Sequence, residues 1–204
     1  MDLSELALRM TGSAPEVECS GSAEESVQIL KRAIAGDRVA FDQIILRYER
    51  QVLMTAWRLL GSREDAQDAA QEVFLRLYRY RHRIDEKRAL LPWLYRMTVN
   101  VCHDLRRKRR RDDALAAGEI DLPHFAYDPT GEIARGEQRR IIQAAFRTLT
   151  EKERAAVVLR DIEGLGTKDV AGILGSSETT VRSQISMARV KIRKFVDTLE
   201  KKRS

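Results

Sequence analysis

Residues Glu163 to Phe195, EGLGTKDVAGILGSSETTVRSQISMARVKIRKF, carry the most specific pattern in this chain. Counted from Thr167, the fifth residue is small, the ninth is glycine and the fifteenth is β-branched; these are Ala171, Gly175 and Val181. The small residue lets two helices approach, the glycine can adopt the left-handed conformation of a tight turn, and the valine fills the angle between the helices. This spacing predicts a helix-turn-helix. The alternative is a helical hairpin with no role in DNA binding.

The second helix of this motif has two different faces. Its apolar side chains recur at helical spacing and predict a buried stripe, which consists of Val181, Ile185, Ala188, Ile192 and Phe195. Hydroxyl and basic side chains lie on another face, as a helix in the major groove of DNA requires. The residues that we expect to contact DNA there are Thr179, Thr180, Arg182, Ser183, Ser186, Arg189 and Arg193.

Charges are segregated in the middle of the chain. Six consecutive basic residues, Arg106–Arg111, precede a stretch from Asp112 to Ala134 that holds six acids and no Lys or Arg. This acidic stretch also contains two prolines, and such a composition is typical of an extended linker between two domains. Beyond it, Thr150 and Glu153 have capping-box spacing and predict a helix from Glu151 to about Ile162.

On the N-terminal side of the linker, Leu91 to Arg111 reads LPWLYRMTVNVCHDLRRKRRR and predicts an amphipathic helix. Its apolar stripe consists of Leu94, Met97, Val101 and Leu105. The opposite face carries amide and cationic donors at helical spacing, namely Arg96, Asn100, His103, Arg107 and Arg110. Trp93 and Tyr95 stand at the head of the helix. Planar rings beside cations can stack unpaired bases while the cations hold the backbone; a solvated helix with core aromatics is the alternative.

Residues Arg63 to about Arg81 predict another helix, whose buried stripe consists of Ala66, Ala70, Val73, Phe74 and Leu77. Leu75 falls on the opposite face and should be exposed. The polar residues around it are Asp68, Gln71, Glu72 and Arg79. A leucine ringed by polar residues is typical of the anchor of a docking surface, although a single exposed leucine is also ordinary. No histidine or further carboxylate converges on the acids at 65, 68 and 72, so we predict no metal site there.

Two more helices are predicted before this one. The first begins at the capping-box pair Ser22 and Glu25, ends at Gly36, and has an apolar stripe of Val27, Leu30 and Ile34. The second runs from Asp37 to Gly61 and has an apolar stripe of Phe41, Ile44, Ile45, Tyr48, Val52 and Ala56. Residues 1–21 offer little to bury, and we expect them to be disordered.

The composition restricts the class of protein. A net charge of +6 favours an anionic partner. The two cysteines, Cys19 and Cys102, lie far apart with no CxxC and no paired histidines, so neither a disulfide framework nor a metal or other cofactor is expected. No apolar run approaches the roughly 18 residues of a membrane span, and Asp2 and Glu5 precede any basic residue, unlike a signal peptide. We therefore expect a reduced, cytoplasmic protein without membrane insertion.

Four segments follow one another in a distinctive order: GDRVAFDQIILRYERQV (36–52), REDAQDAAQEVFLRLYRY (63–80), PWLYRMTVNVCHDLRRKRRR (92–111) and LTEKERAAVVLRDIEGLGTKDVAGILGSSETTVRSQISMARVKI (149–192). Together they resemble the bacterial RNA polymerase sigma factors of the extracytoplasmic-function (ECF) group, over about residues 25–197. The resemblance implies an all-α protein of two small helical domains joined by an acidic flexible linker, the C-terminal domain being the helix-turn-helix. The implied parts are a disordered extension (1–21), sigma region 2 (22–111), the linker (112–128) and sigma region 4 (129–204).

The same resemblance implies a role for each part. The helix with Asp68, Gln71, Glu72 and Leu75 would dock on core RNA polymerase. The segment from Arg83 to Asn100, which includes Trp93 and Arg96, would recognise and melt the minus-10 element of promoter DNA. From the donor face of the same helix, and not from the resemblance, we also expect His103 and Arg107 to contact DNA. The linker would thread the polymerase channel, and the helix-turn-helix would read the minus-35 element. An anti-sigma factor is a further implied partner, and no catalysis is implied.

Two differences from the family pattern are present. Thr150 stands where relatives usually have proline, and it keeps the helix cap. Gln184 and Met187 stand where relatives are often basic, so we expect weaker minus-35 binding. Two other functions stay open from the residues alone. One is a regulator that binds duplex DNA without polymerase, and the other is a nucleic-acid enzyme that uses the acids near Asp65.

Overall fold

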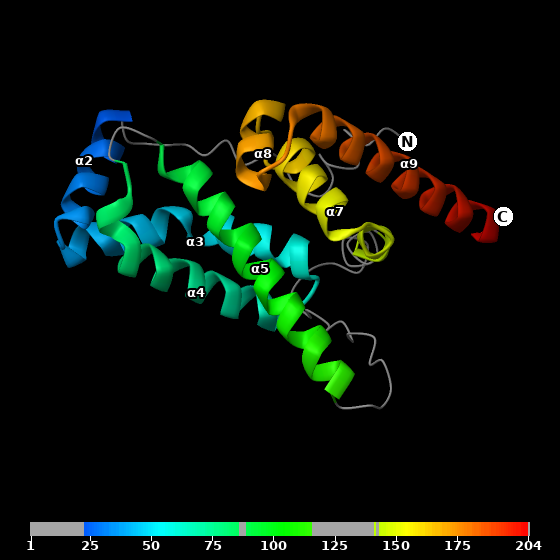
Figure 1. Cartoon of the computed structure of the whole chain (residues 1–204), viewed down its shortest axis with the longest axis horizontal. Helices are drawn as coiled ribbons and strands as arrows, with labels where there is room; N and C mark the ends of the chain where they lie inside the picture. Colours follow the sequence, from blue (N-terminus) through cyan, green and yellow to red (C-terminus); the bar gives the residue numbers. More distant parts are fainter. Residues whose placement is uncertain (1–22, 86–88, 116–140, 142, 204) are drawn as a thin grey trace. The chain divides into compact units, whose positions relative to one another are not determined.

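The structure is a computed structural model and describes residues 23–85, 89–115, 141 and 143–203. Within these ranges the chain forms helices and no strand, so the predicted all-α class is confirmed. The chain divides into two compact units, and Figure 1 shows α2 to α5 in one and α7 to α9 in the other. The predicted N-terminal extension and most of the predicted linker lie outside the described residues.

The N-terminal unit is built around α3 (Arg38–Leu60), which packs against α2 (Ala23–Ile34), α4 (Arg63–Tyr80) and α5 (Leu90–Leu115). A short 3-10 helix, η1 (Arg81–Arg83), follows α4. Apolar side chains from all four α-helices make the core, including Leu30, Ile44, Val52, Ala56, Val73, Leu77, Leu94 and Val101. Burial of each large aliphatic side chain contributes about 1.5–3 kcal/mol, so the packing of four helices on one another stabilises the unit.

The ends of α3 follow from the residues that flank it. The Asp37 side chain accepts a hydrogen bond from the Ala40 backbone N–H at 3.2 Å and caps the N-terminus. Gly61 ends the helix in the left-handed conformation, with φ 81°, and its N–H donates to the Trp57 carbonyl. Ser62 then caps α4 by accepting from the Asp65 N–H at 3.3 Å. All three ends match the prediction, and they leave only two residues between α3 and α4.

The predicted buried stripe of α4 is confirmed, since Ala66, Ala70, Val73, Phe74 and Leu77 are all buried. The stripe predicted for the first helix is wrong at one position, because Val27 stays 40% exposed. α2 packs through Leu30 and Ala33 instead. Its buried face is therefore rotated toward Ala33 and away from Val27.

The C-terminal unit holds α7 (Glu151–Val157), η2 (Val158–Ile162), α8 (Thr167–Leu174) and α9 (Glu178–Arg203). The helix predicted from Glu151 to about Ile162 is confirmed in extent. Its last part, η2, is a π-helix, in which the Glu163 N–H donates to the Val158 carbonyl five residues back at 2.9 Å. The sequence pattern does not reveal this wider turn.

The helix-turn-helix is confirmed at each of its three diagnostic positions. Ala171 is buried between α8 and its neighbours, and Val181 is fully buried at the start of α9. Gly175 ends α8 with φ 59°, and its N–H donates to the Ala171 carbonyl. The predicted buried stripe of α9 is also confirmed, with Val181, Ile185, Ala188 and Ile192 buried and Phe195 half-buried.

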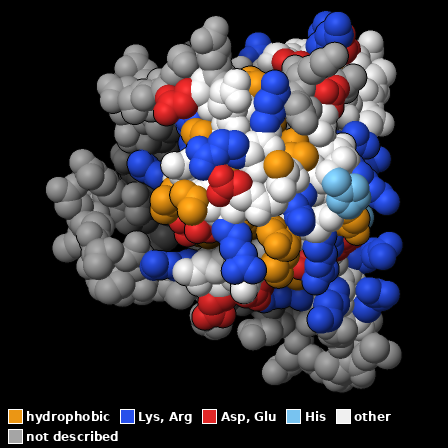
Figure 2. Space-filling view, turned by 90° about the vertical axis from the view of Figure 1, so that its left-hand side faces the viewer, with side chains coloured by type: hydrophobic (Ala, Val, Ile, Leu, Met, Phe, Trp, Pro, Cys, Tyr) orange, Lys and Arg blue, Asp and Glu red, His pale blue; other side chains and the backbone are white. Residues whose placement is uncertain are grey.

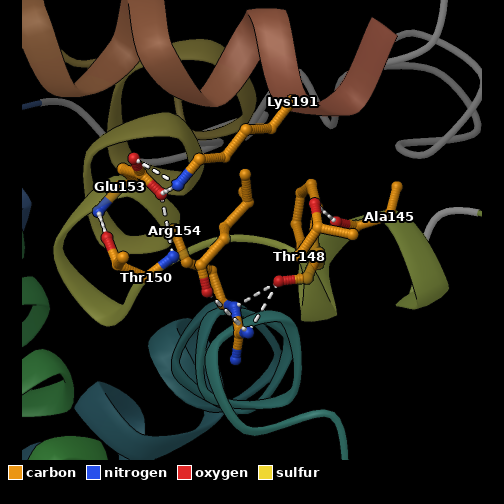
Figure 3. A network of polar contacts seen from close by, with 8 residues as sticks. Ala145, Thr148, Thr150, Glu153, Arg154 and Lys191 are labelled. Atoms are coloured by element: carbon orange, nitrogen blue, oxygen red, sulfur yellow. Dashed lines mark hydrogen bonds and ion pairs between the residues drawn. The ribbon is translucent and has the colours of Figure 1, made fainter. Parts of the chain in front are cut away.

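A polar network ties the start of α7 to α9 (Figure 3). Thr150 and Glu153 form the predicted capping box, in which each side chain accepts a hydrogen bond from the other residue's backbone N–H. Lys191 of α9 donates to both carboxylate oxygens of Glu153 at 2.8 Å. Next to it, the buried Arg154 donates to the Phe146 carbonyl and so satisfies the end of the preceding helical segment, 143–147.

Two opposing effects set the charge state of Glu153. Burial acts to raise its pKa, but the hydrogen bonds from Lys191 and Thr150 outweigh burial and hold the pKa of Glu153 below its ordinary value. A carboxyl whose pKa is lower in the folded state stabilises the fold above its unfolded-state pKa. That contribution is lost as the pH falls through the folded-state pKa.

We expect Glu153→Gln to destabilise the C-terminal unit by about 1 kcal/mol at pH 7, because Lys191 loses its charged partner. The difference from wild type should shrink as the pH falls below the ordinary carboxyl value of 4.5. Thermal unfolding followed by circular dichroism from pH 7 to pH 3 measures this. Fluorescence of Trp57 and Trp93, both in the N-terminal unit, is the control and should not change. Equal pH dependence in the two proteins would contradict the assignment.

Candidate nucleic-acid interface

The outer face of α5 carries the donors that the sequence predicts there. Arg96, Asn100, His103 and Arg107 are all exposed, and Trp93 is half-buried at the start of the helix. The opposite side is buried, but it is wider than the predicted stripe. It includes Thr98 and Cys102 beside Leu94 and Val101.

The polar residues on the buried side of α5 are accommodated in different ways. The Thr98 hydroxyl donates to the Leu94 carbonyl one turn earlier at 2.8 Å, which satisfies it without an outside partner. Burial raises the pKa of the Cys102 thiol to about 12. Cys102 is therefore a neutral core residue rather than a reactive thiol.

The prediction that Tyr95 stands beside Trp93 as a stacking ring is wrong. Tyr95 is buried, and its hydroxyl accepts a hydrogen bond from the Gln51 amide of α3. Tyr95 lies on the same face of the helix as Thr98 and Cys102, and all three belong to the buried side of α5. A tyrosine in a core needs a partner for its hydroxyl, and Gln51, far away in sequence, supplies it. Trp93 is therefore the only ring of this pair on the donor face.

The basic run Arg106–Arg111 divides into two groups. Arg106 donates to the Leu59 carbonyl at the end of α3 at 2.7 Å, and Arg109 pairs with the Asp65 carboxylate in the first turn of α4. These two arginines hold α5 against the turn between α3 and α4. Arg107 and Lys108 lie between them and are exposed. The sequence presents six similar cations and gives no signal for this division.

The face of α4 around Leu75 is exposed as predicted. The Leu75 side chain is 44% exposed, and Asp68 and Gln71 on the same face are exposed as well. Glu72 is half-buried, because Arg76 binds it at 2.7 Å and also approaches Asp104 of α5 at 3.5 Å. The hydrogen bond to Glu72 is the main reason that the pKa of Arg76 is raised. A leucine anchor thus stands beside a carboxylate whose position is fixed.

The predicted DNA face of α9 is exposed throughout: Thr179, Thr180, Arg182, Ser183, Ser186, Arg189 and Arg193. Two of its cations have acidic partners in the same unit. Arg182 binds Glu178 one turn earlier at 2.8 Å. Arg189 binds Asp161 of η2 through Nε at 3.0 Å and Nη2 at 2.7 Å. This second pair links the π-helical turn to α9, and the sequence analysis missed it.

Gln184 and Met187, which stand where relatives are often basic, differ in their exposure to solvent. Met187 is 51% exposed on the outer side of α9, and Val190 is exposed beside it, one turn further on. Gln184 is half-buried, and its side-chain oxygen is buried. Of these two replaced positions, Met187 is thus the one that faces outward.

Three further findings bear on the class of protein. Among the residues that the structure describes, no group of three or more His, Cys, Asp or Glu side chains could hold a metal ion. Asp65, the acid on which a nuclease would depend, is buried and bound by Arg109. No helix in the described ranges is long and apolar enough to span a membrane.

Comparison with known families finds two matches, one in each unit. The family Sigma-70 region 2 matches residues 44–112, and the family Sigma-70, region 4 matches residues 139–192. RNA polymerase sigma-H factor of Pseudomonas aeruginosa is 32% identical, over 86% of this chain and 96% of that protein. ECF RNA polymerase sigma factor SigM of Mycobacterium tuberculosis is 33% identical, over 92% of this chain and 93% of that protein.

Solved structures share the fold. The structure of CnrH in complex with the cytosolic domain of CnrY is similar with a TM-score of 0.65 and 23% identity, over 85% of this chain and 97% of that chain. The sigma factor RpoE from Bartonella quintana, in complex with the anti-sigma factor NepR, gives a TM-score of 0.66 and 21% identity, over 77% and 96%.

Two helical units, of which one ends in a helix-turn-helix and the other exposes a row of donors, define a DNA-binding protein of the transcription machinery. With relatives this similar over nearly their whole length, the chain belongs to the ECF group of the sigma-70 family of RNA polymerase sigma factors.

Proposed function

We propose that this chain directs core RNA polymerase to promoters, with α4 as the docking helix, α5 as the element that opens minus-10 DNA, and α9 as the reader of the minus-35 element. The observation that supports this most strongly is the outer face of α5. There Arg96, Asn100, His103 and Arg107 are exposed in one row, while the buried side and two arginines fix the helix to the rest of its unit.

An element that opens DNA has to offset the cost of unstacking, a few kcal/mol per base. The α5 face can do so because it combines Trp93, which can stack a base, with amide and cationic donors for base edges and phosphates. A helix-turn-helix explains duplex binding only. The presence of both faces in one chain therefore supports promoter opening over the function of a duplex-binding regulator.

In α9 the roles divide along the helix. Arg182, Ser183 and Ser186 lie in its first turns, where side chains of a recognition helix reach base edges. The exposed pair of Arg182 with Glu178 is weak enough to exchange for a base contact. Arg193 lies further along and suits a phosphate. Asp161 fixes the guanidinium of Arg189, so we assign Arg189 a positioning role in addition to its predicted DNA contact.

For the remaining parts, the proposal follows the family to which the chain belongs. We propose the boundaries 22–111 for region 2, 112–128 for the linker through the polymerase, and 129–204 for region 4. The similar sigma factor RpoE of Bartonella quintana is in complex with the anti-sigma factor NepR, and we propose an anti-sigma factor as a partner here. The chain would act in the cytoplasm, because its proposed partners, polymerase and promoter DNA, are there. The proposed role includes no catalytic activity of the chain itself.

We expect Leu75→Arg to weaken binding to core RNA polymerase by about 30-fold, because a charged side chain replaces the apolar anchor of the docking face, at ~2 kcal/mol. Leu46→Arg is the matched control, since Leu46 is another exposed leucine, 77% exposed, on α3. Binding of labelled protein to core polymerase measures both, and circular dichroism checks folding. If both variants bind core polymerase as wild type does, the docking face is misassigned.

The basic run gives a second test. Arg107→Ala with Lys108→Ala should flatten the dependence of promoter affinity of the holoenzyme on salt, by a slope of about 1 to 2 on a double-logarithmic plot, because these exposed cations would release counterions from phosphates. The matched control replaces Arg106 and Arg109 by alanine. That control should lower the unfolding temperature of the N-terminal unit instead, since both arginines hold α5 in place. An unchanged slope in the first variant would show that Arg107 and Lys108 do not contact DNA.

A further inference from the structure

The C-terminal end of α4 and η1 expose two tyrosines among basic residues. Residues 78–83 read YRYRHR, and Tyr78 and Tyr80 are 43% and 42% exposed. Arg79, His82 and Arg83 are exposed as well. Arg79 belongs to the predicted docking face, and Arg83 begins the segment that is expected to recognise the minus-10 element. Neither prediction includes the two tyrosines or Arg81.

Each tyrosine is covered by a guanidinium group. Arg81 places its Cζ 4.5 Å from the centre of the Tyr78 ring and donates to the Tyr78 carbonyl at 2.7 Å, so it is held in position. Phe41 and Tyr78 meet in an edge-to-face arrangement, with 5.3 Å between their ring centres. Arg83 lies over the Tyr80 ring, with its Cζ 5.5 Å from the ring centre. The result is two cation–π pairs close together in the sequence.

A basic helix C-terminus alone does not account for this arrangement. Cations near the last turn interact favourably with the helix dipole, which explains Arg79 and Arg81. It does not explain two large aromatic rings that remain more than two-fifths exposed at the same place. Exposed tyrosine rings with guanidinium groups beside them offer flat surfaces for bases and N–H donors for phosphates, which is the chemistry that binds a single nucleic-acid strand.

The cluster lies in the same unit as the donor face of α5. Figure 1 shows the end of α4 and the start of α5, where Trp93 stands, at the same end of this unit. Figure 2 looks at that end and shows hydrophobic side chains interleaved with those of Lys and Arg. A strand that leaves the α5 face in this direction would meet cations and rings.

We propose that Tyr78, Tyr80, Arg81 and Arg83 form a second binding site for single-stranded DNA, which stacks bases without reading their sequence. That this strand comes from the opened minus-10 element rests on the proposed function. The stacking itself does not, so it can be tested on the free protein.

The test uses the full chain, a fluorescein-labelled 20-nucleotide oligo(dT) and a 20-base-pair duplex, with affinity measured by anisotropy at low salt. Tyr80→Ala should weaken binding of oligo(dT) about fivefold or more, the loss expected for one stacked base, and change duplex binding less than about twofold. Tyr80→Phe keeps the ring and should bind like wild type. Arg50→Ala is the matched charge control, because it removes an exposed cation from α3; it should affect oligo(dT) less than about twofold.

Three outcomes would overturn the proposal. They are no binding of oligo(dT) by wild type, equal binding by wild type and Tyr80→Ala, and an equal loss on both probes. A fourth would assign the surface to a protein partner: Tyr80→Ala binds oligo(dT) normally but loses core polymerase. If the wild-type chain does not bind core polymerase, the proposed function is contradicted instead. The oligo(dT) measurements would still decide whether the tyrosine–arginine site binds single-stranded DNA. Circular dichroism and tryptophan fluorescence confirm that each variant is folded.

Discussion

The N-terminal unit depends on how α5 is fixed to the turn between α3 and α4. Arg106 donates to the Leu59 carbonyl at the end of α3, and Arg109 binds Asp65 in the first turn of α4, across 47 and 44 residues of sequence. Gly61 ends α3 and Ser62 caps α4 within that turn. Because the two ends of the turn are fixed, α5 cannot rotate about its axis without losing both contacts. Arg96, Asn100, His103 and Arg107 are thereby kept on the outside.

The two units present different chemistry, and the difference suits two states of DNA. The α5 face and the tyrosine–arginine pairs at the end of α4 combine rings with cations, which suits bases that have left the duplex. α9 presents hydroxyls, arginines and the exposed Met187 on a helix whose other side is packed on α7 and α8, which suits the major groove of an intact duplex. A protein that recognises one promoter element as duplex and opens another needs both.

Features set by local sterics could be predicted from the sequence. The helix-turn-helix follows from Gly175 and Val181, the caps from Asp37 and Thr150, and the exposure of Leu75 from helical periodicity. Features that depend on distant partners could not. The Gln51 amide donates a hydrogen bond to the hydroxyl of the buried Tyr95. Arg106 and Arg109 differ from Arg107 only through their partners on α3 and α4, and Arg189 binds Asp161 across 28 residues. Periodicity places a residue on a face but does not say which element covers that face.

The central claim is that the outer face of α5 captures the opening strand, and the reactivity of minus-10 thymines to permanganate in the holoenzyme-promoter complex tests it most directly. Asn100→Ala should reduce this reactivity while binding to core polymerase stays at the wild-type level, because Asn100 is exposed and belongs to no core contact of the unit. Gln43→Ala, which removes an exposed amide from α3, should leave reactivity unchanged. Wild-type reactivity in Asn100→Ala, or loss of polymerase binding with it, would contradict the account.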